Sequence, residues 1–233
     1  MEREDVMDKK NDFYVQNVSQ DACHGTISSS FASTSVVNEK FQRFVERVHS
    51  CHRCPRMEGR TRVFGLENGS INARILFIAE APGRFGAERT GIPLAGDQTG
   101  RNFEMLLNEA DLQRASVFIT NAVLCNPQDI QGRNASPSPS EIANCSDHLR
   151  TTLDLLQPQY VIALGHVALR ALQHVEMHSL TLIKDTGRPV IWYNRWLIAL
   201  YHPGPRARVH RSFERQKEDF RQLKAFIMHA QIL

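Results

Sequence analysis

Four of the five cysteines have a spacing that suits a metal site. Cys51 and Cys54 form a C-x2-C pair, Cys125 follows an apolar run, and Cys145 lies in a helical pattern twenty residues later. Thiolate ligands in a roughly tetrahedral arrangement suit zinc or an iron–sulfur cluster. Free cysteines are also common in protein cores. The spacing alone therefore leaves zinc, an iron–sulfur cluster and a chance arrangement open.

Three other segments contain residues suited to binding a polar or anionic ligand. Residues 80–100 are rich in glycine, which lets backbone N–H groups approach a ligand closely. Asn121 ends an apolar run, and its amide can both donate and accept along one edge of a base. His202 opens a proline-rich loop followed by several arginines, which suit phosphate groups. Each segment also has a plainer interpretation: a common loop, a turn cap, or a solvated basic helix start.

Short apolar runs alternate with helical patterns along most of the chain. Strands are expected at residues 74–80, 117–123, 160–165 and 196–201, with an edge strand at 190–193. Helices are expected from Asn38, over 102–110, from Ser140, after Gly165, and in a long C-terminal segment. Ser138 or Ser140 is a candidate cap with Pro139 in the first turn. The pattern predicts a three-layer αβα fold with a central, mostly parallel four-stranded sheet. Ligands of such folds bind beyond the carboxyl ends of the strands.

Composition predicts one domain with a tail. Of the 233 residues 42% are hydrophobic, and residues 1–37 are polar and serine-rich, so we expect a disordered tail followed by a domain at 38–233. The sequence shows no apolar span or signal pattern, which predicts a soluble protein of the cytoplasm without membrane contact. Five cysteines without a signal favour reduced thiols or metal binding over disulfides. The net charge of +3 is uneven, because residues 1–40 hold seven acids and four bases. The remaining residues, at +6, are compatible with a polyanionic partner.

Taken in order, these segments resemble the uracil-DNA glycosylase superfamily, in particular its iron–sulfur branch, families 4 and 5. The resemblance covers residues 40–228 and includes the four cysteines. Its other matching pieces are Glu80-Ala81-Pro82-Gly83, the stretch from Arg89 to Asp97, Thr120-Asn121-Ala122-Val123, Leu164-Gly165 with Ala168, and His202-Pro203.

The resemblance implies base excision. Such an enzyme flips a damaged nucleotide out of the duplex and hydrolyses the bond between base and deoxyribose, leaving an abasic site. Asn121 would then read the uracil edge, and His202 would donate to a carbonyl oxygen of the departing base. The residues after His202 would wedge into the minor groove. The base pocket would include Ala81, Pro82, Gly83 and Leu94, and the phosphate contacts would be Arg206, Arg208 and Arg211.

The chain departs from the family pattern at two positions. Ala81 stands where the best-known branches have an acidic or amide group that positions water, so the carboxylate role passes to Asp97, with Glu80 as competitor. Asp97 could equally be an ordinary turn residue after Gly96. Leu94 replaces the usual aromatic that stacks on the base, a role for which Phe85 and Phe103 are substitutes. The loop at 126–136 lacks the basic insertion of the branch that captures uracil covalently, so covalent capture is not expected.

The resemblance implies DNA containing uracil or another deaminated base as the partner of a monomer that is associated with the nucleoid when it acts. It favours a structural [4Fe–4S] cluster on the four cysteines, with zinc as the alternative. A competing hypothesis is a DNA-binding protein of the same fold that hydrolyses weakly or not at all, for which Ala81 and Leu94 are the support.

Overall fold

The computed structural model describes residues 27–230, and the chain divides into two units between Val36 and Val37. Helix α1 (Ile27–His49) begins before the start at Asn38 that the sequence predicts. Residues 1–26 of the expected tail, with Cys23, lie outside the described residues. The division into a tail and a domain stays a prediction. Within the described residues, no helix is both long and apolar enough to cross a membrane.

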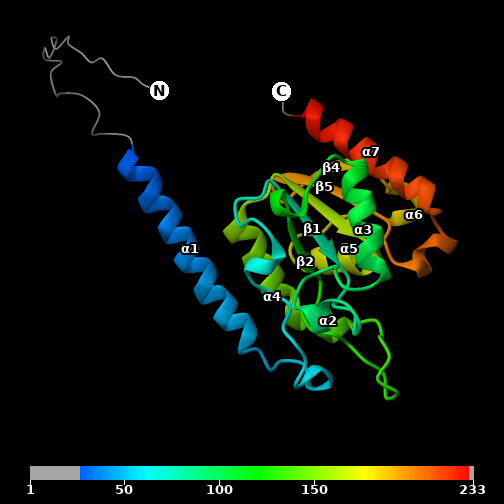
Figure 1. The fold of residues 1–233 in the computed structure, drawn as a ribbon, viewed down its shortest axis with the longest axis horizontal. Coiled ribbons are helices and arrows are strands. Elements are labelled where there is room, and N and C mark those ends of the chain that lie inside the picture. The colour runs from blue at the N-terminus through cyan, green and yellow to red at the C-terminus, as the bar shows by residue number, and fades with distance from the viewer. Residues whose placement is uncertain (1–26, 231–233) are drawn as a thin grey trace, which may run out of the picture. The chain divides into compact units, whose positions relative to one another are not determined.

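A five-stranded sheet in the order β2-β1-β3-β5-β4 forms the centre of the second unit (Figure 1). The first four of these strands run parallel, and β4 pairs antiparallel with β5 at one edge. The four parallel strands and the edge strand are those expected from the sequence. Their bounds are Ile75–Ala79 for β1, Phe118–Asn121 for β2, Tyr160–Leu164 for β3, Pro189–Trp192 for β4 and Arg195–Leu200 for β5.

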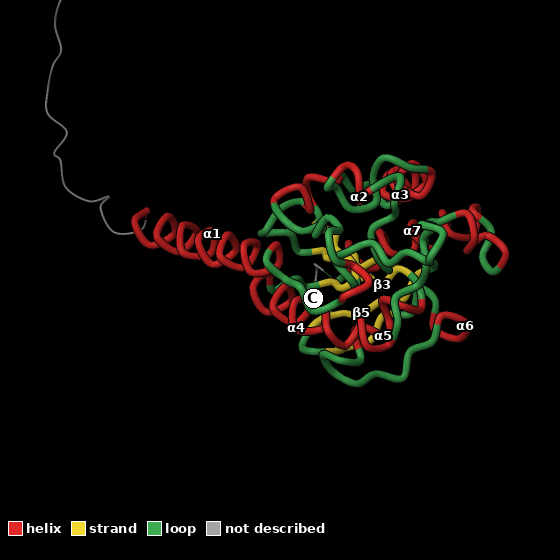
Figure 2. The backbone as a smooth tube through the Cα atoms, turned by 90° about the horizontal axis from the view of Figure 1, so that it is seen from below, coloured by secondary structure: helices red, strands yellow, loops and turns green. Residues whose placement is uncertain are grey.

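Helices cover both faces of the sheet, which gives the expected three layers (Figure 2). Alternate residues of each strand point to opposite faces, so Leu76 and Ile78 join one apolar core while Phe77 and Ala79 join the other. The first core includes α4, α5 and the part of α1 after Val36, and the second includes α3 and α7. The helix bounds are Ala87–Thr90 for α2, Gln98–Glu109 for α3, Pro139–Leu156 for α4, His166–Leu172 for α5, Leu182–Asp185 for α6 and Phe213–His229 for α7.

The register of the parallel strands brings their carboxyl ends to one edge of the sheet. Ala79 lies opposite Asn121, and Leu164 lies opposite Leu200. The loops that follow β1, β2, β3 and β5 therefore leave the sheet side by side, as the topology of a parallel sheet requires.

Local sequence signals position α4 over this sheet. Ser138 caps the helix by accepting the Glu141 backbone N–H, Glu141 accepts the Ser138 N–H at 2.7 Å, and Pro139 occupies the first turn. This is a capping box, and it confirms Ser138 as the cap. Glu141 also pairs with Arg56, so the start of α4 is tied to the segment that holds the first two cysteines.

His148 on α4 is buried in the first core beside Phe44, and neither ring nitrogen has a hydrogen-bond partner among the described residues. Burial, together with the positive charges of Arg53 and Arg47, lowers the pKa of this imidazole from its ordinary 6.5 to about 4. The folded protein therefore resists protonation that the unfolded chain accepts.

We expect the free energy of unfolding to fall as the pH drops from 6.5 towards 4, because the unfolded state then binds the extra proton. His148 contributes about 3 kcal/mol to this loss. The variant His148→Phe keeps an aromatic ring beside Phe44 and removes the titrating group. Urea unfolding at pH 7 and pH 4.5 should show a smaller loss in the variant than in the wild type. An equal loss in both would contradict the assignment.

Candidate functional site

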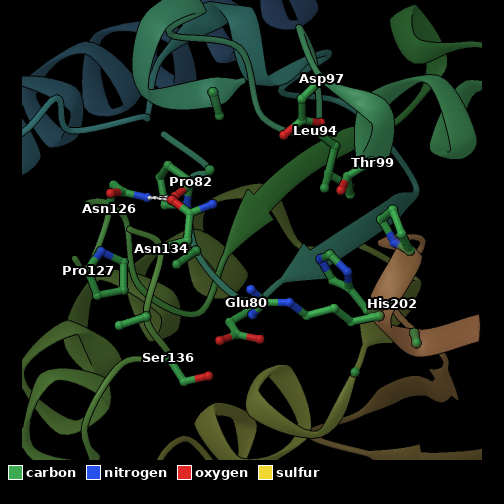
Figure 3. Close-up of a pocket in the computed structure, with 18 of the residues that line it drawn as sticks. Glu80, Pro82, Leu94, Asp97, Thr99, Asn126, Pro127, Asn134, Ser136 and His202 are labelled. Atoms are coloured by element: carbon green, nitrogen blue, oxygen red, sulfur yellow. Dashed lines mark hydrogen bonds between the residues drawn. The ribbon is translucent and has the colours of Figure 1, made fainter. Parts of the chain in front are cut away.

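A cavity of about 520 Å³ opens at the carboxyl edge of the sheet. Its walls come from the loops after β1, β2, β3 and β5, with parts of α2, α3 and α6. Of the residues expected to touch the base or its sugar, those that line the cavity are Glu80, Ala81, Pro82, Gly83, Leu94, Asp97 and His202. Figure 3 shows Asp97, Leu94 and Thr99 on one side, and Asn126, Asn134 and Pro127 on another.

His202 follows β5 and presents a neutral imidazole to the cavity. Its Nδ1 accepts the backbone N–H of Gly204 at 3.0 Å, so the neutral ring carries its proton on Nε2. Burial lowers the pKa of His202, and the neighbouring Glu80 and Asp97 carboxylates offset part of this effect. The site therefore holds an uncharged N–H donor close to two acids.

Asp97 caps α3, and it also faces the cavity. Its Oδ1 accepts the Gly100 N–H at 2.9 Å, so Asp97 is the N-cap of α3, a role that the sequence did not predict. Its Oδ2 lies against the backbone of the loop after β1: a Cβ on Gly86 would be 2.7 Å from this oxygen, and one on Gly83 would be 3.1 Å away. Only glycine at position 86 leaves room for the carboxylate. One oxygen thus holds the helix while the other remains for a ligand.

Glu80 lies directly after β1 and is half-buried. Its backbone carbonyl accepts the Val123 N–H at 3.1 Å, which fixes the main chain at this point. Its side chain lines the cavity without a hydrogen-bond partner in residues 36–230. Glu80 is therefore a carboxylate without a hydrogen bond or ion pair to residues 36–230.

Leu94 lines the cavity in the left-handed region of backbone space, with φ of 49°. This conformation is uncommon for a residue other than glycine and costs about 1–3 kcal/mol. Arg114 holds it in place by donating to the Pro93 and Leu94 carbonyl oxygens at 2.8 and 2.9 Å. Neither proposed aromatic substitute lines the cavity, because Phe103 is buried against Phe77 and Phe220, and Phe85 is mainly exposed.

Asn121 does not line the cavity, although the resemblance to the family predicted that it reads the base. It is 2% exposed at the end of β2, and its amide nitrogen is buried without a partner among the described residues. Two asparagines from the segment after β2 line the cavity instead, Asn126 and Asn134. Sequence reasoning missed both, and the signal available was only their place in a Pro- and Ser-rich loop.

Asn134 is oriented by two hydrogen bonds. Its Oδ1 accepts the Arg84 backbone N–H and the Asn126 side-chain N–H, each at 2.9 Å. The Asn126 amide also donates to the Pro82 carbonyl oxygen, which ties the segment after β2 to the loop after β1. The Asn134 amide nitrogen then points towards the cavity as a fixed donor (Figure 3).

The three arginines predicted to bind phosphates have different surroundings. Arg206 is exposed at the cavity and has no hydrogen bond or ion pair within the described residues. Arg208 donates to Asn102 Oδ1 at 2.8 Å, and Asn102 in turn donates to the Pro203 carbonyl oxygen beside His202. Arg211 pairs with the buried Asp219 of α7. The structure therefore leaves Arg206 free to meet an anion, while Arg208 and Arg211 also brace the loop.

The four cysteines named from their spacing line one small cavity, which confirms that they lie together. Cys51 and Cys54 follow α1, Cys125 follows β2 and Cys145 lies in α4. All four are free thiols. Asn144 links the first pair to α4 by donating to the Arg53 carbonyl oxygen at 3.1 Å and to Cys54 Sγ at 3.5 Å.

The surroundings of these thiols suit a cationic group bound by thiolates. Burial raises the pKa of Cys125 to about 11 and that of Cys145 to about 12, so both need a bound cation to lose their protons. Arg53 and Arg62 line the same cavity, where their charges offset those of several thiolates. Among the described residues no three metal-binding side chains converge closely enough to hold a single ion.

We expect Gly204→Ala to disturb His202 specifically, because the added Cβ would lie 2.9 Å from Nδ1 and 3.3 Å from Cε1. The ring must move and lose the acceptor role that fixes its tautomer. Nitrogen NMR of the histidine rings should show a weaker preference for the Nε2–H form, with circular dichroism unchanged. Gly65→Ala is the matched control, since a Cβ there has no neighbour within 4 Å. Unaltered His202 signals in Gly204→Ala would contradict this account of the site.

The fold and the cavity belong to an α/β protein that binds a ligand beyond its parallel strands. Residues 66–225 match the family model of the uracil DNA glycosylase superfamily, and the chain belongs to this superfamily. It is similar to a Type-4 uracil-DNA glycosylase of Thermotoga maritima, with 33% identity over 186 residues, 78% of this chain and 92% of the relative. A Type-4 enzyme of Archaeoglobus fulgidus shares 30% identity over 171 residues, 71% of this chain and 82% of its own. A Type-5 enzyme of Pyrobaculum aerophilum shares 30% over 193 residues, 71% of this chain and 83% of its own.

Proposed function

We propose that this chain is a DNA glycosylase that flips uracil or another deaminated base out of DNA and hydrolyses the N-glycosyl bond to leave an abasic site. The observation that supports this best is a single cavity lined by a neutral His202 and the carboxylates of Glu80 and Asp97. Membership of the superfamily and the names of the relatives agree with this activity. A cavity of about 520 Å³ has the size of a site for a small ligand such as one nucleotide.

His202 stabilises the departing base in this mechanism. Negative charge develops on a carbonyl oxygen of uracil as the glycosidic bond lengthens, and a fixed N–H donor lowers the energy of that state. His202 Nε2–H meets this need, since Gly204 occupies Nδ1 and burial keeps the ring neutral. The neutral His202 ring can therefore stabilise the departing uracil anion by a hydrogen bond while it keeps its own proton.

Asp97 and Glu80 act on the sugar side of the bond. Cleavage leaves positive charge on the deoxyribose, which a nearby carboxylate stabilises, and the same group orients the attacking water. We assign the main role to Asp97, whose Oδ2 is directed at the loop after β1, and a supporting electrostatic role to Glu80.

Amide side chains read the base edge. The fixed Asn134 nitrogen suits a uracil carbonyl oxygen. Asn121 stays a candidate through its buried amide nitrogen, which has no hydrogen-bond partner among the described residues. The backbone of Ala81, Pro82 and Gly83 and the side chain of Leu94 form the remaining walls. Leu94 supplies an apolar surface without aromatic stacking, so selectivity among bases is expected to be looser.

Asp97→Asn should reduce single-turnover excision of uracil by about 100-fold, the effect of losing a positioned acid or base. Asparagine caps a helix as well as aspartate does, so α3 should persist and circular dichroism should not change. Glu80→Gln should have the smaller effect. The reverse order of the two effects would transfer the main role to Glu80.

A non-catalytic DNA-binding protein is the alternative function, favoured by Ala81 at the position of a usual water-positioning group. Incubation of the wild type with uracil placed opposite guanine, opposite adenine and in single strands separates the two. Tight binding without any abasic product on all three substrates would support the alternative.

We further propose that Cys51, Cys54, Cys125 and Cys145 hold a structural [4Fe–4S] cluster. The support is that four thiols line one small cavity, and four cysteine thiolates are the usual ligand set of such a cluster. Bound there, the group would cross-link the segment after α1, the segment after β2 and α4. Cys125 directly precedes Asn126, so the same link would support the wall of the base cavity.

Purified protein should contain about four irons and absorb broadly near ~400 nm. Cys125→Ser should lose most of this iron and unfold at a lower temperature, because the three elements are no longer joined. Cys23→Ser, which alters the fifth cysteine, is the control and should keep both properties. Stoichiometric zinc without iron would overturn the choice of metal but retain the four ligands.

Arg206 at the cavity is the first candidate for a phosphate contact, with Arg208 and Arg211 as secondary ones.

We infer that a monomer acts on DNA inside the cell. A substrate of this kind requires no second subunit, since one chain supplies every group of the proposed mechanism.

A further inference from the structure

The loop between β2 and α4 contains a small hairpin, and the proposed chemistry uses Asn134 near its end but not its tip. It projects from the body at the lower side of Figure 1. Gln128 and Asn134 form an antiparallel bridge. The Asp129 N–H donates to the Arg133 carbonyl oxygen, and the Ala135 N–H to that of Pro127, both at 2.9 Å. We call residues 127–135 the β2–α4 hairpin.

The tip of this hairpin is held from inside by one side chain. Asp129 Oδ1 accepts the backbone N–H groups of Gln131 and Arg133 at 2.9 Å each, and Arg133 Nε donates to Oδ2 at 2.8 Å. The Arg133 N–H is the main reason that the pKa of Asp129 is lowered. Gly132 completes the turn with φ of 72°. Such a turn is shaped by its own hydrogen bonds.

The hairpin is also fastened to the rim of the cavity. Arg84, in the loop after β1, donates from Nη1 to the Gly132 carbonyl oxygen at 2.7 Å and from its backbone to Asn134 Oδ1 at 2.9 Å. Pro127 and Asn134, at the two ends of the hairpin, both line the cavity. The tip therefore has a fixed position relative to the place where a flipped base would enter.

This arrangement presents Ile130 to solvent. Its side chain is 97% exposed at the tip, and the neighbouring charges of Asp129 and Arg133 are paired with each other. The tip thus shows an apolar group without net charge, which suits contact with stacked bases better than contact with phosphates. Other exposed apolar side chains lie close in sequence to residues that line the cavity: Phe85, Ile183 and Val209.

We propose that Ile130 is a wedge residue that enters the base stack of duplex DNA and keeps a uracil nucleotide extruded, acting from the β2–α4 hairpin as a second element beside the loop after His202. The inference rests on the proposed function. Apolar side chains inserted between base steps unstack and kink a duplex. Because the hairpin is fastened beside the cavity, the DNA whose base enters the cavity would also contact Ile130.

A wedge assists only where a base must leave a stack, so the test compares duplex with single-stranded substrate. Ile130→Ala should slow single-turnover excision from a duplex with uracil opposite adenine by about tenfold. Excision from the same strand without its complement should change less than about twofold. Ile191→Ala, at an exposed isoleucine of β4 that does not line the cavity, is the matched control and should affect neither.

The hairpin itself provides a second pair of variants. Asp129→Ala removes the acceptor of two N–H groups and should reproduce the duplex-selective loss, because Ile130 is no longer held outwards. Asp129→Asn keeps that acceptor, loses only the ion pair with Arg133, and should stay near wild-type rates.

The outcomes separate this proposal from the proposed function. No excision of uracil by the wild type from either substrate would refute the glycosylase itself. If the wild type excises uracil and Ile130→Ala excises it at the wild-type rate from both substrates, the wedge role is overturned. The exposed tip would then be a contact site for another protein. An equal loss on duplex and single strand would also overturn it, since a wedge has no task on an unstacked strand.

Discussion

The parallel register of the central sheet is the constraint on which the rest of this structure depends. It brings the ends of β1, β2, β3 and β5 to one edge, so that four loops far apart in sequence share one cavity. Glu80 and His202 meet there only because the strands that precede them are aligned. The apolar residues that maintain this alignment are buried on both faces of the sheet, and they make the site a consequence of the core.

Burial then determines what the meeting groups can do. His202 stays neutral because desolvation outweighs the attraction of two carboxylates, and the Gly204 N–H directs its proton to Nε2. Asp97 divides its two oxygens between the start of α3 and the cavity. The backbone of Leu94 at this cavity adopts an unfavourable left-handed conformation, which the hydrogen bonds from Arg114 hold in place. Preorganised donors and acids of this kind are what cleavage of a glycosidic bond requires.

The cysteine cavity and the base cavity share one stretch of chain. Cys125 belongs to the first, and Asn126 to the second, where its amide holds the Pro82 carbonyl oxygen and Asn134. The β2–α4 hairpin continues directly from this stretch. A group that fixes Cys125 would therefore limit movement of the cavity wall, which gives the cysteines an effect on binding without any part in the chemistry.

The sequence by itself determined the features that depend on near neighbours. Its apolar runs predicted the four parallel strands and the edge strand, and Pro139 with Ser138 or Ser140 predicted the start of α4. The spacing of the four cysteines allowed one shared site but also a chance arrangement, and the structure brings them together. The sequence also predicted the position of His202, because a residue that directly follows a parallel strand lies at the carboxyl edge of the sheet, where ligands bind. The helix start at Ile27 was missed, because its polar stretch has little helical periodicity.

Contacts between distant residues were decided only by the tertiary structure. Asn121 is buried while Asn134 reaches the cavity, because the segment after β2 folds back over Pro82. Arg211 pairs with Asp219 on α7, a partner that no local pattern indicates. These outcomes depend on which groups remain without partners after the chain has packed. That property belongs to the folded molecule and is absent from any short stretch of sequence.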